Sequence, residues 1–387
     1  MLQVKNANAN QGNTRNFSLL GDPALRLAIP QYNVVTTSIN GLPISTMDTL
    51  KALTKASVSG FIADQNGQKI SNFNGVLYPT IFDKAVEVNT LNNDGAGIFR
   101  FSSRESKVFK GRASVKNGDF SFDFIVPKDI SYSFGEGKIS YYSDNGKEDA
   151  NGYTESFIIG GSNSNGIVDE VGPQLDLYLN DESFVYGGIT DENPILLAKL
   201  FDEQGINTVG NGIGHDLVAI LDQNTDNSII LNDYFESEID NYTKGEIQFQ
   251  LNDLAEGRHT ITLKAWDNAN NSSEKTVEFN VISSKEIELD NVLNYPNPFT
   301  TNTEFLFQHN QPGIPLDVKL EIFTVSGKLV KTISQVVVSE GYLSRDIRWN
   351  GRDDYGDRIG KGVYVYKLKV RSRNGSVSEK YEKLVIL

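Results

Sequence analysis

The chain contains no cysteine among its 387 residues, and this absence excludes several chemistries. Without cysteine there can be no disulfide bond, no zinc–thiolate centre and no cysteine nucleophile. The compartment stays open, because an oxidising location permits disulfides without requiring them. Histidine is also scarce, and the three copies at His215, His259 and His309 are too scattered to predict a zinc site.

Long apolar runs are missing as well. No run of about 18 or more apolar residues occurs, so the sequence predicts no membrane-spanning helix. Residues 1–20 are polar and lack the apolar core of a signal peptide. The formal net charge of −14 argues against a nucleic-acid surface and against binding to anionic lipid, because both need clustered Lys and Arg.

The sequence is rich in the features of β structure. Phe, Tyr and Gly are frequent, at 21, 16 and 34 copies, and no helical period persists beyond a few residues. Short alternating runs separated by turn residues predict an all-β fold of three consecutive immunoglobulin-like β-sandwiches after a short N-terminal remnant. The predicted divisions are residues 1–30, 31–165, 170–285 and 286–387, with a linker at 160–166.

The clearest pattern lies in the last predicted domain. Tyr295-Pro296-Asn297-Pro298-Phe299 cannot be a central strand, because each proline removes a backbone donor and fixes φ. It therefore predicts an extended segment that leads into a strand in which Thr303, Phe305 and Phe307 share one face. Further strands are expected at residues 318–323, 329–333, 362–370 and 380–387, with a turn at 325–328.

Four motifs in this domain carry a resemblance to known proteins. They are Tyr-Pro-Asn-Pro-Phe at 295–299, Val-Ser-Gly-Lys-Leu-Val at 325–330, Trp-Asn-Gly-Arg-Asp-Asp-Tyr-Gly at 349–356 and Gly-Val-Tyr-Val-Tyr-Lys-Leu at 362–368. Together they resemble the C-terminal sorting domain of proteins exported by the type IX secretion system. They are also similar to the FlgD-type immunoglobulin-like domain of the flagellar hook cap.

A second resemblance begins near the N-terminus. Asn-Phe-Ser-Leu-Leu-Gly-Asp-Pro-Ala-Leu-Arg-Leu at 16–27 is similar to the closing segment of a gingipain-type (C25) cysteine-peptidase domain. The segments at 73–75, 126–130, 206–208 and 212–216 resemble the non-catalytic region of PorU-type sortases. The catalytic Cys and His of that family lie upstream of these segments, so the resemblance implies that this chain alone has no peptidase activity. A signal peptide is then expected upstream of Met1 in a full-length parent.

The sortase resemblance implies a role at the cell surface, associated with the outer membrane. The parent would remove C-terminal sorting domains from secreted cargo and attach the cargo to an anionic lipopolysaccharide. The last domain would dock on a PorV-type outer-membrane β-barrel, and the two middle domains would act as spacer and support. The alternative is a secreted adhesin or other cargo whose last domain is its export signal. A third hypothesis is a hook-cap-like scaffold, which accounts for the last domain only.

The sharpest local motif is the glycine-rich stretch at 210–216, which ends in His215 and Asp216. A His beside an Asp suggests acid–base chemistry, but adjacent strand residues point to opposite faces, which disfavours a hydrogen-bonded dyad. No Lys-Ser or Lys-Thr follows the glycines, so they do not form a phosphate loop. The motif favours a structural turn, and no catalytic or cofactor-binding residue is predicted in the chain.

Two acidic clusters are candidate cation sites. Asp222, Asn224, Asp226 and Asp233 partly match a calcium loop, although its sixth position is Asn227 instead of Gly and its twelfth is Asp instead of Glu. Asp353, Asp354 and Asp357 form the second cluster. Both clusters also fit ordinary turn chemistry, so calcium is the one cofactor left open. Trp266 and Trp349 are expected to anchor sandwich cores.

Overall fold

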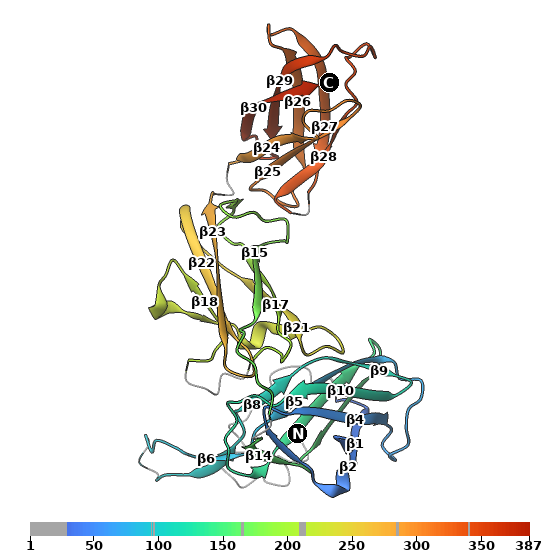
Figure 1. Ribbon diagram of the computed structural model, residues 1–387, viewed down its shortest axis with the longest axis vertical. Helices are drawn as coiled ribbons and strands as arrows, with labels where there is room; N and C mark the ends of the chain where they lie inside the picture. The colour runs from blue at the N-terminus through green and yellow to red at the C-terminus, as the bar shows by residue number, and fades with distance from the viewer. Residues whose placement is uncertain are drawn as a thin grey trace, which may run out of the picture.

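The computed structural model describes residues 29–93, 95, 97–163, 166–208, 214–283, 286–339 and 341–387. The regular elements in these ranges are β-strands and short 3-10 turns, which confirms the predicted all-β class. Figure 1 shows three β units arranged end to end, with the C-terminus in the uppermost one. Within these ranges there is no helix of the length and apolarity needed to cross a membrane. Of the predicted remnant at 1–30, residues 1–28, with the 16–27 motif, lie outside the described residues.

The first unit is built on one long sheet that closes on itself. The strand order is β12-β13-β1-β4-β10-β9-β5, and β5 also pairs with β12, which completes the ring. Alternation in β10 turns Phe120, Phe122 and Phe124 toward the enclosed core. The strands are β1 (Tyr32–Ile39), β4 (Lys55–Ala63), β5 (Gly75–Phe82), β8 (Lys107–Lys110), β9 (Ala113–Lys116), β10 (Asp119–Ile125), β12 (Lys138–Asp144) and β13 (Asp149–Thr154).

The first residues of the linker predicted at 160–166 belong to a β-strand. Residues Ile158–Ser162 form β14, which pairs with β3 (Thr49–Ala52) and with β11 (Gly135–Glu136). Gly160 is required here for close approach, since a Cβ at this position would lie 2.3 Å from the Ser133 carbonyl oxygen. Gly160 and Gly161, which were expected to belong to a flexible linker, are therefore part of a strand.

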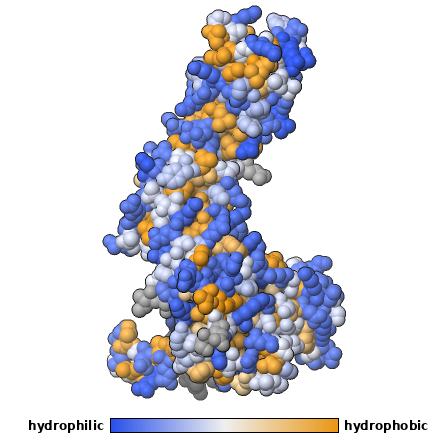
Figure 2. Space-filling view, viewed as in Figure 1, coloured by the Kyte–Doolittle hydropathy of each residue, from blue (hydrophilic) through white to orange (hydrophobic). Residues whose placement is uncertain are grey.

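A hairpin of β6 (Val86–Asn89) and β7 (Arg100–Ser103) projects from the first unit. Val86, Phe99 and Phe101 are exposed on it, and orange residues mark this projection at the lower left of Figure 2. The Phe99 and Phe101 rings stack with centroids 6.4 Å apart.

The second unit is a two-sheet sandwich. Ile261, Leu263 and Ala265 alternate with more exposed residues and are fully buried between the sheets. One sheet has the order β15-β17-β21-β20 and the other the order β16-β23-β22-β18-β19. The strands are β15 (Gln174–Leu179), β16 (Ile189–Thr190), β17 (Ile195–Phe201), β18 (Val218–Leu221), β19 (Ile229–Ile230), β20 (Phe235–Ser237), β21 (Lys244–Gln250), β22 (Gly257–Trp266) and β23 (Ser272–Val281).

The third unit is also a two-sheet sandwich. Thr303, Phe305 and Phe307 share one face as predicted, and that face is buried. The expected hairpin turns at Gly327, whose φ is +84°. The sheets have the orders β24-β25-β28 and β27-β26-β29-β30. The strands are β24 (Leu289–Tyr295), β25 (Thr303–His309), β26 (Leu316–Thr324), β27 (Leu329–Val337), β28 (Leu343–Trp349), β29 (Gly362–Arg371) and β30 (Val377–Ile386). Each of the three units has its own hydrophobic core.

Candidate functional site

The Tyr-Pro-Asn-Pro-Phe motif holds the last strand of the chain. The Asn297 amide donates to the Lys383 carbonyl oxygen at 3.0 Å and accepts the Val385 N–H at 2.9 Å. The Phe299 N–H donates to the Val385 carbonyl oxygen at 3.0 Å, and the Leu387 N–H donates to the Phe299 carbonyl oxygen at 2.9 Å. These bonds use backbone groups of β30, an edge strand whose outer side would otherwise be unpaired.

The Trp-Asn-Gly-Arg motif contacts Phe299 through the core of the third unit. The Phe299 and Trp349 rings pack edge to face with centroids 5.7 Å apart, and both side chains are buried. The Trp349 indole N–H donates to the Arg352 carbonyl oxygen at 2.8 Å. We call Asn297, Phe299, Trp349 and β30 the terminal lock. Two motifs far apart in the sequence thus form one structural unit that secures the C-terminal strand.

The acidic cluster beside the terminal lock is occupied by turn contacts. One Asp353 oxygen accepts the N–H groups of Tyr355 and Asp357, both at 2.9 Å. Asp354 pairs with Lys331 at 3.1 Å, and this hydrogen-bonded lysine lowers the pKa of the carboxyl. These contacts fit the turn interpretation of the cluster.

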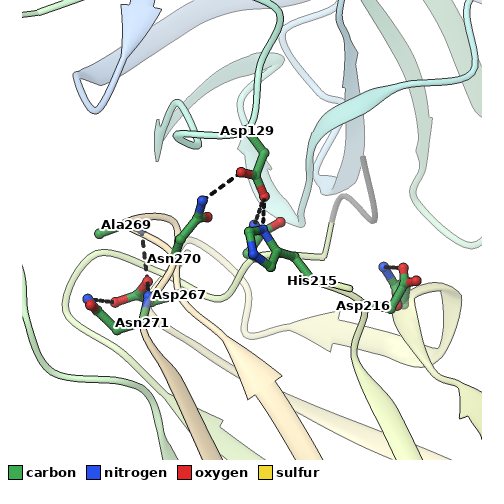
Figure 3. A network of polar contacts seen from close by, with 9 residues as sticks. Asp129, His215, Asp216, Asp267, Ala269, Asn270 and Asn271 are labelled. Atoms are coloured by element: carbon green, nitrogen blue, oxygen red, sulfur yellow. Dashed lines mark hydrogen bonds and ion pairs between the residues drawn. The ribbon is translucent and has the colours of Figure 1, made fainter. Parts of the chain in front are cut away.

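Figure 3 shows that His215 and Asp216 have separate partners. The His215 Nδ1 lies 2.7 Å from an Asp129 oxygen in the first unit, whereas Asp216 accepts a hydrogen bond from Asn232 at 3.1 Å. The two side chains therefore form no dyad, in keeping with the opposite faces expected of neighbours. The glycine-rich residues 209–213 lie outside the described residues.

Asp129 is the centre of a polar contact between the first and second units. Besides His215, it accepts hydrogen bonds from Asn207 at 3.2 Å and from Asn270 at 2.6 Å. The His215 ring packs against the Trp266 ring with centroids 4.3 Å apart. The expectation that Trp266 anchors a core is wrong. Period-two alternation places Trp266 on the outer face of β22 with Lys264. There it packs at the joint between the first and second units instead of in a core.

A second set of contacts crosses the same joint. The Arg112 guanidinium donates to the Ser237 carbonyl oxygen at 2.6 Å and to Glu236 at 2.9 Å. Lys107 pairs with Asp233 at 2.6 Å. Two separate attachments of this kind restrict rotation of the second unit on the first.

The four calcium candidates are not brought together. Asp233 pairs with Lys107 across the joint, and Asp222 pairs with His259 at 2.7 Å. Asn224 accepts the Asp226 N–H at 3.2 Å inside the hairpin tip. Among the described residues, these carboxylates form no cluster of potential ligand atoms.

We expect Asp129→Ala to loosen the first joint. The change removes three hydrogen-bonding contacts to the second unit, and the loss of such part-buried polar contacts costs about 1–3 kcal/mol. Limited proteolysis should therefore cut more rapidly between the two units. Asp226→Ala, in an exposed hairpin tip of the second unit, should leave the rate unchanged. Equal protection in wild type and Asp129→Ala would contradict the assigned role.

A different acidic group lies at the base of the second unit. Oxygen atoms of Asp169, Asp202 and Asp267 lie within 4.8 Å of one another, a spacing that could suit a divalent cation. Each carboxylate also accepts a backbone N–H, from Val171, Gln204 and Asn271 respectively. Sequence reasoning missed this group because its members come from three separate loops.

Burial gives this acidic group a distinct pH dependence. Burial raises the pKa of Asp202 to about 7 and also raises the pKa of Asp267. Because the unfolded Asp202 ionises near pH 3.8, folding stability falls as the pH rises from about 4 to about 7. When a metal chelator is present, Asp202→Asn should raise the free energy of unfolding at pH 8 by on the order of 2 kcal/mol. At pH 4 the same substitution should change it little. A chemical-denaturation series at both pH values checks this. Destabilisation at pH 8 would contradict it.

The joint between the second and third units is polar and buried. The Asn310 amide donates to the carbonyl oxygens of Ser283 and Glu286 at 3.0 and 2.8 Å and accepts the Glu288 N–H at 2.9 Å. Next to it, His309 is fully buried, and its Nε2 lies 2.7 Å from the Ser339 hydroxyl. Burial lowers the pKa of His309 to about 4. One asparagine thus fixes the connecting segment onto the third unit.

Comparison with known proteins gives structural neighbours. The chain is similar to dimeric latent PorU from Porphyromonas gingivalis, with 31% identity over 100% of this chain and 37% of that chain, and a TM-score of 0.44. It is also similar to a Bacteroides ovatus mixed-linkage glucan utilization protein, SGBP-B, with 11% identity over 92% and 70% of the two chains and a TM-score of 0.28. A 1.5-MDa bacterial ice-binding adhesin matches with 11% identity over 93% and 99%, and a TM-score of 0.20.

This chain therefore spans about 37% of the PorU chain it matches. No protein-family profile matches the sequence, and no curated protein matches it.

Proposed function

We propose that this chain is the non-catalytic support and docking region of a PorU-type sortase of the type IX secretion system. The observation that carries the proposal is the terminal lock. Two of the four motifs that resemble a type IX sorting domain meet at one place, where Asn297 and Phe299 secure the last strand. A secured terminal sandwich is suited to binding a partner through its sheet faces and edges.

The remaining units fit the role of spacer and support. Polar contacts centred on Asp129 and Arg112 restrict motion at the first joint, and Asn310 holds the segment that enters the third unit. A rod with restricted joints would hold a peptidase domain at a set distance from the docking point. In this proposal the last unit docks on a PorV-type outer-membrane β-barrel at the cell surface. The parent enzyme then removes sorting domains from cargo and attaches the cargo to lipopolysaccharide.

The docking role is tested by binding to the barrel. The full chain and a variant lacking residues 286–387 are compared for binding to the PorV-type barrel of the same bacterium, held in lipid nanodiscs. We expect the full chain to bind and the shortened chain to lose binding. Equal binding by both, or binding by neither, would overturn the proposal.

A second test concerns catalysis. The sequence contains no cysteine, so the nucleophile of the parent enzyme would have to come from outside these residues. The chain alone is expected to leave an Arg or Lys reporter peptide and a sorting-domain substrate intact. Measurable turnover of either would contradict the non-catalytic assignment.

The second candidate is a secreted cargo protein or adhesin. The same terminal lock would serve such a protein as its export signal, so the motif by itself suits both roles. The two candidates differ in the fate of the last unit, because a cargo loses it on export and a sortase retains it.

A further inference from the structure

Charge is distributed unevenly along the chain. Residues 286–387 carry 14 Lys and Arg against 13 Asp and Glu, whereas residues 1–285 carry 22 against 37. The third unit therefore has a net charge of +1, and the rest of the chain has a net charge of −15. An acidic partner would be repelled by most of this protein and would approach the third unit most easily.

Basic side chains of the third unit gather on the outer face of the sheet formed by β27, β26, β29 and β30. Alternation turns Lys319 of β26 and Lys367, Lys369 and Arg371 of β29 away from the core. Lys319 and Lys369 are direct cross-strand partners. We call Lys319, Lys367, Lys369 and Arg371 the basic face.

The basic face is only partly neutralised within the chain. Lys319 pairs with Glu321 at 2.7 Å, and Lys367 pairs with Glu379 at 2.7 Å. Among the described residues, Lys369 and Arg371 form no ion pair, although Asp317 is the cross-strand partner of Arg371. Like charges placed directly opposite each other, as in Lys319 and Lys369, lower the stability of a sheet. A bound carboxylate would relieve this repulsion.

The shape and the rim of the basic face favour a protein surface as its occupant. A hollow of about 570 Å³ lies over β27, β26 and β29 between these side chains. Val336 and Tyr381 lie on strands that flank the face and are 63% and 57% exposed. Protein interfaces combine apolar and aromatic contacts with charges of both signs. A phosphate polymer fits this face less well, because phosphate-binding surfaces are more uniformly basic and this face also carries Asp317, Glu321 and Glu379.

We propose that the basic face binds an acidic protein surface and that it is the contact by which the third unit docks. The inference rests on the proposed docking role and names the face and the chemistry that would perform it. Carboxylates of the partner would lie opposite Lys369 and Arg371. Charge complementarity of this kind fixes orientation and raises the association rate, and it weakens as the ionic strength rises.

The test uses the full chain with two charge-matched double variants. Lys369→Glu/Arg371→Glu reverses the basic face, and Lys361→Glu/Lys380→Glu reverses two exposed lysines outside it. The probes are the barrel in nanodiscs, poly-L-glutamate and polyphosphate, at low and at high salt. We expect the basic-face variant to bind the barrel and poly-L-glutamate at least about tenfold more weakly at low salt. The control variant should change by less than about threefold.

The outcomes separate this inference from the docking role. Barrel binding that depends on residues 286–387 but not on the basic face would overturn the inference and leave the docking role standing. Unchanged poly-L-glutamate binding by the basic-face variant would also overturn it. Tighter binding of polyphosphate than of poly-L-glutamate, lost in the same variant, would assign the face to a phosphate polymer instead. Matching thermal unfolding curves would show that both variants fold.

Discussion

Phe299→Ala is expected to destabilise the third unit by about 3–5 kcal/mol, the usual cost of truncating a buried aromatic ring. Phe299 is 2% exposed and packs against Trp349, so its loss leaves a cavity in the terminal lock. We also expect β30 to separate from the unit more readily, since the backbone of Phe299 pairs with this strand. Denaturant unfolding followed by Trp349 fluorescence, in a Trp266→Phe background, measures the change.

Tyr295→Ala provides the matched control for this prediction. Tyr295 belongs to the same motif, but its side chain is 72% exposed, so truncation leaves no core cavity. The unfolding midpoint of this variant should stay close to that of the parent. If Phe299→Ala and Tyr295→Ala had equal effects, the motif would not act through the lock described here.

Acid is expected to destabilise the third unit through His309. Burial lowers the pKa of this imidazole to about 4, whereas the unfolded value is 6.5. The folded state therefore resists a proton that the unfolded state accepts, so stability is complete above pH 6.5 and is lost as the pH falls toward 4. A difference of this size corresponds to about 3 kcal/mol. Denaturant midpoints read by Trp349 between pH 7.5 and pH 4 should follow this course.

His309→Gln separates this contribution from that of other titrating groups. Glutamine can keep a hydrogen bond near Ser339 but does not titrate, so the variant should lose most of the slope between pH 6.5 and pH 4. A variant with the full acid sensitivity of the parent would show that His309 is not its source.

The strands were largely predictable because their signal is local. The strand expected at residues 362–370 is β29, which spans Gly362–Arg371, and the hairpin of β26 and β27 turns where Gly327 predicts it. Period-two alternation depends only on neighbouring residues, so it can be recognised without knowledge of the fold. The ring closure of the first unit and the short strand β14 depend on distant partners instead, and alternation alone does not reveal them.

The residues of the joints could not be found in the same way. Asp129, Arg112 and Asn310 are single polar residues whose partners lie elsewhere in the sequence. Trp266 was assigned to a core because a large aromatic side chain is usually buried. Its position on the outer-facing side of β22 shows the opposite. The resemblance of the last domain drew attention to Asn297 and Phe299, but their contacts with the final strand required the structure.

The central claim is that the last unit is a retained docking module. Intact-mass measurement of the mature protein released from the cell surface tests this most directly. The account predicts a polypeptide that still contains residues 289–387 and carries no lipopolysaccharide. A mature protein that ends before Leu289 and bears a sugar-lipid mass at its new C-terminus would contradict the account and identify a secreted cargo.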